Sequence, residues 1–145
     1  MLQLRPAPAL AAKVFAVVAV ALGSASCGRA VTVDAAALDS VTEGACQVLH
    51  DQLPRQIASQ NRVAVADDNG TTAAWGGPAI VWRCGVSQPA ALKPTSQLVT
   101  VDGKDWFPET LTDGVRFTTT GATPHVEITF PSTYPTPAAL LAELQ

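Results

Sequence analysis

Positively charged residues are scarce in this sequence, and none of them form a run or a stripe. The 145 residues contain 9 Lys and Arg against 12 Asp and Glu, which gives a formal net charge of −3. Nucleic-acid binding requires clustered Lys and Arg, and so does electrostatic docking on anionic lipid. We therefore expect no nucleic-acid partner and no docking of this kind.

Histidine and the common catalytic motifs are almost absent as well. His50 and His125 are the only histidines, and no Gly-x-Ser-x-Gly elbow, His-Glu-x-x-His helix or glycine-rich phosphate loop occurs. Residues 67–70 (DDNG) lack the alternating ligands and the distal Glu of a calcium loop, so a solvated turn is the better interpretation. A thiol protease built on Cys84 and His125 would need a free thiol. We expect no catalytic residue, no metal site and no cofactor.

The sequence also lacks an apolar run long enough to cross a bilayer. The longest, Val14–Leu22, has nine residues, or about 14 Å as a helix, whereas a bilayer core is about 30 Å thick. Arg5 and Lys13 precede this run, and small residues lead from it to Cys27. This order is typical of an export signal, so we expect residues 1–26 to be a signal peptide.

Cys27 follows the expected cleavage site directly, which is where lipoprotein processing attaches a diacylglycerol. We expect Cys27 to be lipidated and to anchor the chain at the outer face of the cytoplasmic membrane. A large aliphatic residue is usual three places before such a cysteine, and Ser24 stands there instead. Ser24-Ala25-Ser26 also fits ordinary signal peptidase, so secretion of an unlipidated chain stays open. Removing Arg5 and Lys13 from the 9 basic residues leaves seven against 12 acidic ones, a net charge of −5.

The cysteine count favours lipidation. Three cysteines are an odd number for an exported protein. If lipid caps Cys27, then Cys46 and Cys84 remain as one pair in an oxidising compartment, where a disulfide is favoured. Two buried free thiols are the alternative.

The pattern after the leader predicts a tether over residues 27–38 and one domain over residues 39–145. Ser40-Val41-Thr42-Glu43 has the form of a capping box, with Ser40 as the cap. Cys46, Leu49 and Leu53 then place one apolar stripe on a helix. Pro137–Leu144 predicts a short C-terminal helix.

Strand patterns fill the region between the two helices. Ile80, Trp82 and Cys84 alternate with Val81 and Arg83, which predicts one buried and one open face. The resulting fold class is α+β, with an antiparallel meander of about four or five strands whose one face is covered by the helices. The covered face is expected to carry five apolar side chains: Trp82, Val99, Trp106, Phe117 and Ile128.

Two Asp-Gly pairs, Asp102-Gly103 and Asp113-Gly114, predict two-residue hairpin loops. In the first hairpin Val99 should oppose Trp106. In the second, Thr110 should oppose Phe117, which places Glu109 opposite Thr118 and Arg116 opposite Leu111.

Several stretches together resemble a known family. They are AAWGGPAIVWRCGV at residues 73–86, VDGKDW at 101–106, RFTT at 116–119 and VEI at 126–128. Through them the chain is similar to an actinobacterial family of exported proteins and lipoproteins known only as domain of unknown function 3515. The resemblance implies a protein that faces the cell envelope, and it implies no known activity.

Two surfaces are candidates for binding. Trp75, in a Gly-Pro loop, is either an exposed aromatic platform or a structural residue that caps the core. On the open face of the sheet, Arg83, Glu109, Arg116 and Glu127 should share one charged surface, for which a solvated face with weak ion pairs is the alternative.

The expected function is a non-enzymatic binding or assembly module that contacts the membrane through the lipid on Cys27 and takes an envelope protein or a wall precursor as partner. The alternative is a small envelope enzyme that acts on wall glycan or peptide with Glu109 and Asp105 as its carboxylates. Paired carboxylates in a deep pocket would favour the enzyme.

Replacing Cys27 with Ser tests the anchoring. Because the cysteine lies outside the expected domain, Cys27→Ser should fold normally but move from the membrane fraction to the soluble fraction of cells. Detergent partitioning of the two forms measures this. Unchanged partitioning would show that a retained leader or a partner, and not a lipid, supplies the anchoring.

Overall fold

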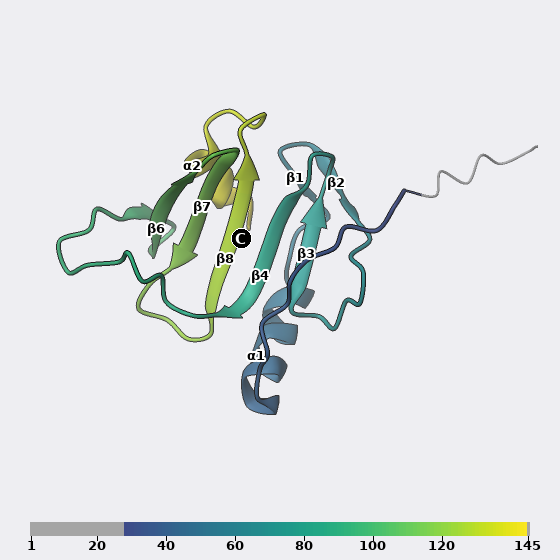
Figure 1. Ribbon diagram of the computed structural model, residues 1–145, viewed down its shortest axis with the longest axis horizontal. Coiled ribbons are helices and arrows are strands. Elements are labelled where there is room, and N and C mark those ends of the chain that lie inside the picture. Colours follow the sequence, from purple (N-terminus) through teal and green to yellow (C-terminus); the bar gives the residue numbers. More distant parts are fainter. Residues whose placement is uncertain (1–27, 145) are drawn as a thin grey trace, which may run out of the picture.

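The computed structural model describes residues 28–144, so the signal peptide and Cys27 lie outside the described residues. The described residues include one eight-stranded sheet in the order β1-β2-β3-β4-β8-β7-β6-β5, in which neighbouring strands are antiparallel. Figure 1 shows α1 at the foot of the sheet near β4, and α2 behind β7 and β8. The elements are α1 (Ser40–Asp51), β1 (Gln56–Ile57), β2 (Gln60–Val63), β3 (Thr72–Trp75), β4 (Ile80–Val86), β5 (Val99–Val101), β6 (Lys104–Leu111), β7 (Gly114–Thr119), β8 (His125–Pro131), α2 (Pro137–Leu140) and the 3-10 helix η1 (Leu141–Leu144).

The prediction of four or five strands was wrong, because it missed the strands before residue 79. β1, β2 and β3 have only 2, 4 and 4 residues, which is too short for a period of two to be recognised. All four residues of β3 are buried, so its sequence shows no polar alternation. The antiparallel pairing and the two terminal helices were predicted.

The arrangement of the helices also differs from the prediction. The C-terminal helix is four residues of α2 followed by η1, and Leu141 is its buried residue. Cys46 is the buried residue of α1. The helices therefore cover the sheet only in part.

The helix α1 begins one residue earlier than the capping box implied. Asp39, and not Ser40, is the N-cap, and its Oδ1 accepts hydrogen bonds from the backbone N–H groups of Val41 and Thr42, both at 3.0 Å. The Thr42 hydroxyl also donates to Asp39 Oδ2 at 2.9 Å. A carboxylate suits the positive end of a helix dipole better than a hydroxyl does. These hydrogen bonds, chiefly from Thr42, lower the pKa of Asp39.

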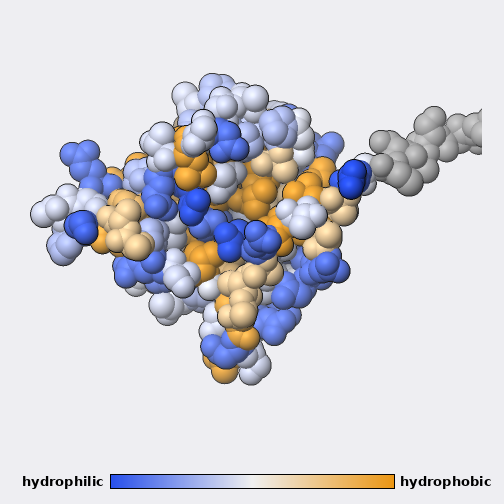
Figure 2. All heavy atoms as spheres, in the orientation of Figure 1, coloured by the Kyte–Doolittle hydropathy of each residue, from blue (hydrophilic) through white to orange (hydrophobic). Residues whose placement is uncertain are grey.

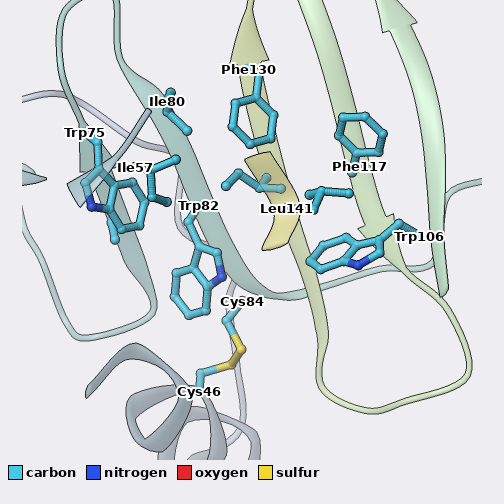
Figure 3. Packing of buried hydrophobic residues seen from close by; sticks show 12 residues of the cluster. Cys46, Ile57, Trp75, Ile80, Trp82, Cys84, Trp106, Phe117, Phe130 and Leu141 are labelled. Carbon is cyan, nitrogen blue, oxygen red and sulfur yellow. A yellow bond between two sulfur atoms is a disulfide. The ribbon is translucent and has the colours of Figure 1, made fainter. Parts of the chain in front are cut away.

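The core lies on one face of the sheet, as the alternation in β4 predicted. Trp82 pairs with Ile128, which pairs with Phe117. Trp106 pairs with Val99 and with Thr119, two residues after Phe117, so all five predicted residues share that face. Figure 3 shows their neighbours Trp75, Ile80 and Phe130 on the same side, with Leu141 of η1 packed among them. The opposite face is not simply open, because Ala74, Thr118 and Glu127 on it are all buried.

The first hairpin has the predicted register. Asp102 and Gly103 both have positive φ, 48° and 77°, and Val99 lies opposite Trp106. This backbone geometry is the one that Asp-Gly favours.

The second hairpin differs from the prediction. Leu111 pairs with Gly114, so Thr112-Asp113 forms the loop and Gly114 belongs to β7. A Cβ at Gly114 would lie 2.1 Å from the carbonyl oxygen of Phe130, so this glycine serves the close approach of β7 to β8 and not the turn. The register therefore shifts by two residues, and Glu109 lies opposite Arg116 instead of Thr118.

The segment expected to be a tether contacts the domain at two described points. Val31 donates its backbone N–H to Ala64 O at 2.9 Å and accepts from Ala66 N at 2.8 Å, which forms a parallel bridge to Val65. Leu38 packs against the hydrophobic core. The chain between Val31 and α1 is thus held at both ends.

The disulfide between Cys46 and Cys84 joins α1 to β4 across 38 residues of sequence. Both cysteines are buried, at 0% and 1% exposure. Figure 3 shows the bond directly below Trp82. A cross-link of this loop length stabilises a small domain mainly by restricting the unfolded chain.

Replacing both cysteines measures that contribution. Cys46→Ala with Cys84→Ala should lose about 4 kcal/mol of unfolding free energy, because the 38-residue loop is no longer closed in the unfolded state. Urea unfolding of the non-reduced protein is the measurement. Reduced wild type is the control and should unfold at nearly the same urea concentration as the double variant. If reduction leaves the wild-type midpoint unchanged, the bond does not form in solution.

Candidate functional site

Trp75 is not an exposed platform, and that interpretation of the Gly-Pro loop was wrong. Its side chain is fully buried at the end of β3. The indole Nε1 donates to the carbonyl of Pro54 at 3.0 Å, and the guanidinium carbon of Arg62 lies 5.8 Å from the ring centroid. The turn after Trp75 is itself anchored, since the Tyr134 hydroxyl donates to Pro78 O at 2.8 Å. The loop therefore caps the core.

The charged side chains predicted on the other sheet face do come together. Glu127 on β8 accepts from Arg83 Nη1 at 3.2 Å, and its second oxygen lies 3.6 Å from Arg116 Nη1. Glu109 lies on the same face, opposite Arg116. Figure 2 shows hydrophilic side chains in the middle of this face, with hydrophobic residues on both sides.

The ion pairs of Glu127 favour a structural role for this cluster. Glu127 is 8% exposed, so its carboxylate would be costly to bury without the two guanidinium groups. The Nε atoms of Arg83 and Arg116 are also buried, and neither has a partner within residues 28–144. Because the arginines already contact Glu127, a partner carboxylate would have to compete with it.

A pocket of about 720 Å³ lies between α1 and the core face of the sheet. Sequence reasoning missed it, because it exists only where the helices leave that face uncovered. The helix contributes Ala45, Val48 and Leu49, and the sheet contributes Trp82 and Trp106. Figure 3 shows these two indole rings on either side of the space beside Leu141. Residues 119–124 close the side opposite the helix.

Trp106 carries a buried donor without an acceptor. The residue is 2% exposed and lines the pocket, yet its Nε1 has no hydrogen-bond partner in the described part of the chain. Buried indole N–H groups are usually paired. This nitrogen has almost no accessible surface, however, so the pocket does not present it to a ligand.

A smaller pocket of about 340 Å³ continues along the same helix. It shares Ala45, Thr123 and Pro124 with the first pocket and adds Val41 of α1 and His125 of β8. Val41 and Val48 are 82% and 59% exposed, which is unusual for valine on a helix that packs on a core. The spacing of Val41, Ala45 and Val48 was the sequence signal for this groove, a second apolar stripe beside that of Cys46 and Leu49.

Ionisable groups elsewhere do not form a metal site. His50 on α1 contacts Arg62 and lies 3.8 Å from Asp68 and 3.7 Å from Asp51. Over residues 28–144 no three side chains of His, Cys, Asp or Glu gather closely enough to hold an ion. Within the same residues no helix is both long and apolar enough to span a membrane.

Comparison with known proteins now places the chain in a family. A family model described as "Protein of unknown function (DUF3515)" matches residues 7–144. The chain belongs to this family. No curated protein and no solved structure matches it. Because the description of the DUF3515 family states no activity, the function has to be argued from the site.

Removing the Glu127 carboxylate tests whether the charged cluster is structural. Glu127→Ala leaves two guanidinium groups facing each other. Breaking a fully buried pair costs about 3–5 kcal/mol, but the arginine side chains are 30% and 34% exposed, so we expect about 1–3 kcal/mol. Glu109→Ala, on the same face, is the matched control and should change the unfolding free energy by less than about 0.5 kcal/mol. If urea unfolding shows that both variants lose the same unfolding free energy, a specific role of Glu127 is contradicted.

Proposed function

We propose that this protein is an exported, lipid-anchored binding module of the cell envelope that acts without catalysis at the outer face of the cytoplasmic membrane. The leader pattern and the position of Cys27 support export and anchoring. The observation that carries the binding function is the pocket beside α1, whose lining is mostly apolar and includes the exposed Val48. Mostly apolar pockets with a few polar groups that fix orientation are typical of ligand sites.

The arrangement of the carboxylates supports binding over wall hydrolysis. Asp105 alternates with Trp106 on β6, so its side chain lies on the face away from the core. There its carboxylate accepts a hydrogen bond from the Thr100 hydroxyl at 2.5 Å, whereas Glu109 lies opposite Arg116. The two carboxylates therefore have separate neighbours and do not form a pair inside the pocket.

Photo-crosslinking from the pocket mouth in cells tests the proposal. Val48 is 59% exposed and lines the pocket, so a photoreactive amino acid should be tolerated there. Illumination of the full-length protein should give one discrete adduct in its intact mass. The matched control places the same amino acid at Ala91, an exposed position outside the pocket, and should give none.

The adduct mass also reports the kind of partner. A protein, a wall precursor or a lipid adduct at position 48 would each support the binding function. Absence of any adduct, or equal adducts from positions 48 and 91, would overturn it. Turnover of wall glycan or peptide that is lost on Asp105→Asn would replace the proposal with the enzyme.

A further inference from the structure

The chain that leads from Cys27 to the domain is fixed to the domain almost at once. Val31 forms a parallel bridge to Val65 through two backbone hydrogen bonds of 2.9 and 2.8 Å. Three exposed residues, 28–30, separate this bridge from Cys27. The free part of the tether is therefore residues 28–30 and not the whole segment 27–38 that the sequence predicted.

The rest of this segment is held as well. Leu38 packs against the hydrophobic core. It also lies directly against Gly85 of β4, where a Cβ would come within 2.4 Å of Leu38 Cδ2. Because the chain is fixed at Val31 and again at Leu38, the residues between them do not lengthen the tether.

The short free chain limits the distance between the domain and a lipid on Cys27. Val31 follows Cys27 by four residues. A fully extended chain spans at most about 3.6 Å per residue, which keeps Val31 within about 14 Å of Cys27.

The sheet is wider than this reach. Val65, to which Val31 is bridged, follows the end of β2 by two residues. β5 lies six positions from β2 in the sheet, which at about 4.8 Å per strand is up to about 29 Å. In Figure 1 the described chain enters beside β3, and the segment between β4 and β5 reaches out on the opposite side, beyond β6. One edge of the sheet is thus near the anchor and the other is far from it.

Charge does not favour an orientation in which the domain lies flat on anionic lipid. Residues 27–145 contain seven basic and 12 acidic residues, a net charge of −5. On one face of the sheet, the two central arginines are paired with Glu127. Beside the other face, α1 exposes Val41 and Val48 but carries Glu43, Asp51 and no Lys or Arg. Helices that lie on a membrane combine an apolar face with Lys and Arg on the polar face.

These constraints define which side of the domain faces the bilayer. We propose that residues 28–31 and the loop 64–70 lie at the lipid headgroups of the membrane, and that the sheet extends outward from there with β5 as its far edge. The partner of this proximal surface is the lipid surface itself. This inference rests on the proposed lipid on Cys27 and adds the orientation of the domain.

The proximal surface has little charge of its own with which to bind lipid. Arg29 is the basic residue of the segment 28–31, whereas the loop carries Asp67 and Asp68. Anionic headgroups attract the arginine and repel the two aspartates. The orientation therefore depends on the shortness of the tether and not on electrostatic attraction.

This orientation restricts the partner of the pocket beside α1. The pocket extends to Lys104–Trp106 of β6. That strand lies five positions from β2, or up to about 24 Å from it. The far part of the pocket then lies well outside the headgroups. A protein or a wall precursor outside the membrane can reach it there without either molecule entering the bilayer.

Photo-crosslinking to lipid in cell membranes tests the orientation. A photoreactive amino acid at Ala64, which is exposed in the proximal loop, should give adducts with the mass of a membrane lipid. The matched control replaces Ala91, which is exposed in the segment between β4 and β5, and should give no lipid adduct. Equal lipid adducts from the two positions would show a domain that lies flat, and none from either would show a domain that stands clear of the membrane. Each of these results overturns the proposal.

Lengthening the tether tests the cause of the orientation. About 20 Gly and Ser residues inserted after Gly28 span about 25 Å on average. The chain should stay in the membrane fraction. Lipid adducts from position 64 should fall about tenfold, because effective concentration falls with roughly the −3/2 power of linker length. The same segment appended to the C-terminus is the matched control and should leave the adducts unchanged. An unchanged yield after the insertion at Gly28 would overturn the role of the short tether.

The membrane fraction separates this inference from the proposed function. If the chain is found only in the soluble fraction, the anchor is absent and both fail. If Cys27→Ser releases the chain from the membrane while positions 64 and 91 give equal lipid adducts, the lipid anchor stands and only the orientation is wrong.

Discussion

The covalent bond between Cys46 and Cys84 fixes the position of α1 on the sheet, and the pocket depends on that position. Cys46 is the buried residue of α1, so little of the helix is embedded in the core. Leu49 and Leu53 pack against the core from its edge. A helix held in this way covers β4 but stands away from β6, and the space between becomes the chamber lined by Trp82 and Trp106. The stability of the fold and the shape of the pocket thus depend on the same bond.

Both faces of the sheet bury polar atoms that have no partner within residues 28–144. On the second face, the buried carboxylate of Glu127 is matched by Arg83 and Arg116 on the two neighbouring strands. The Nε atoms of the same two arginines and the hydroxyl of Thr118 nevertheless have no partner there, and neither does Nε1 of Trp106 on the core face. Unpaired buried atoms therefore do not distinguish one face from the other.

Sequence patterns predicted the parts of this fold that depend on local alternation. The faces of β4 and the first hairpin follow from Trp82, Cys84 and Asp102-Gly103 and were found as expected. The second hairpin was predicted wrongly because Gly114 does not serve the turn. It allows a close approach to Phe130, on a strand that lies later in the sequence. The shift was two residues, an even number, so Glu109 and Arg116 stayed on the predicted face. The pocket was missed: Val41, Ala45 and Val48 indicate a second apolar stripe on α1, but how far the helices extend over the sheet does not follow from local patterns.

The mouth of the pocket departs from what folding alone would favour. Val48 lines the pocket on α1 and exposes an aliphatic side chain to water. If the protein only had to fold, a polar residue at position 48 would be more favourable. Local rules of this kind are broken most often where a site needs them broken. A partner that covered Val48 would remove this penalty on binding, which is why the proposed binding function is assigned to this side of α1.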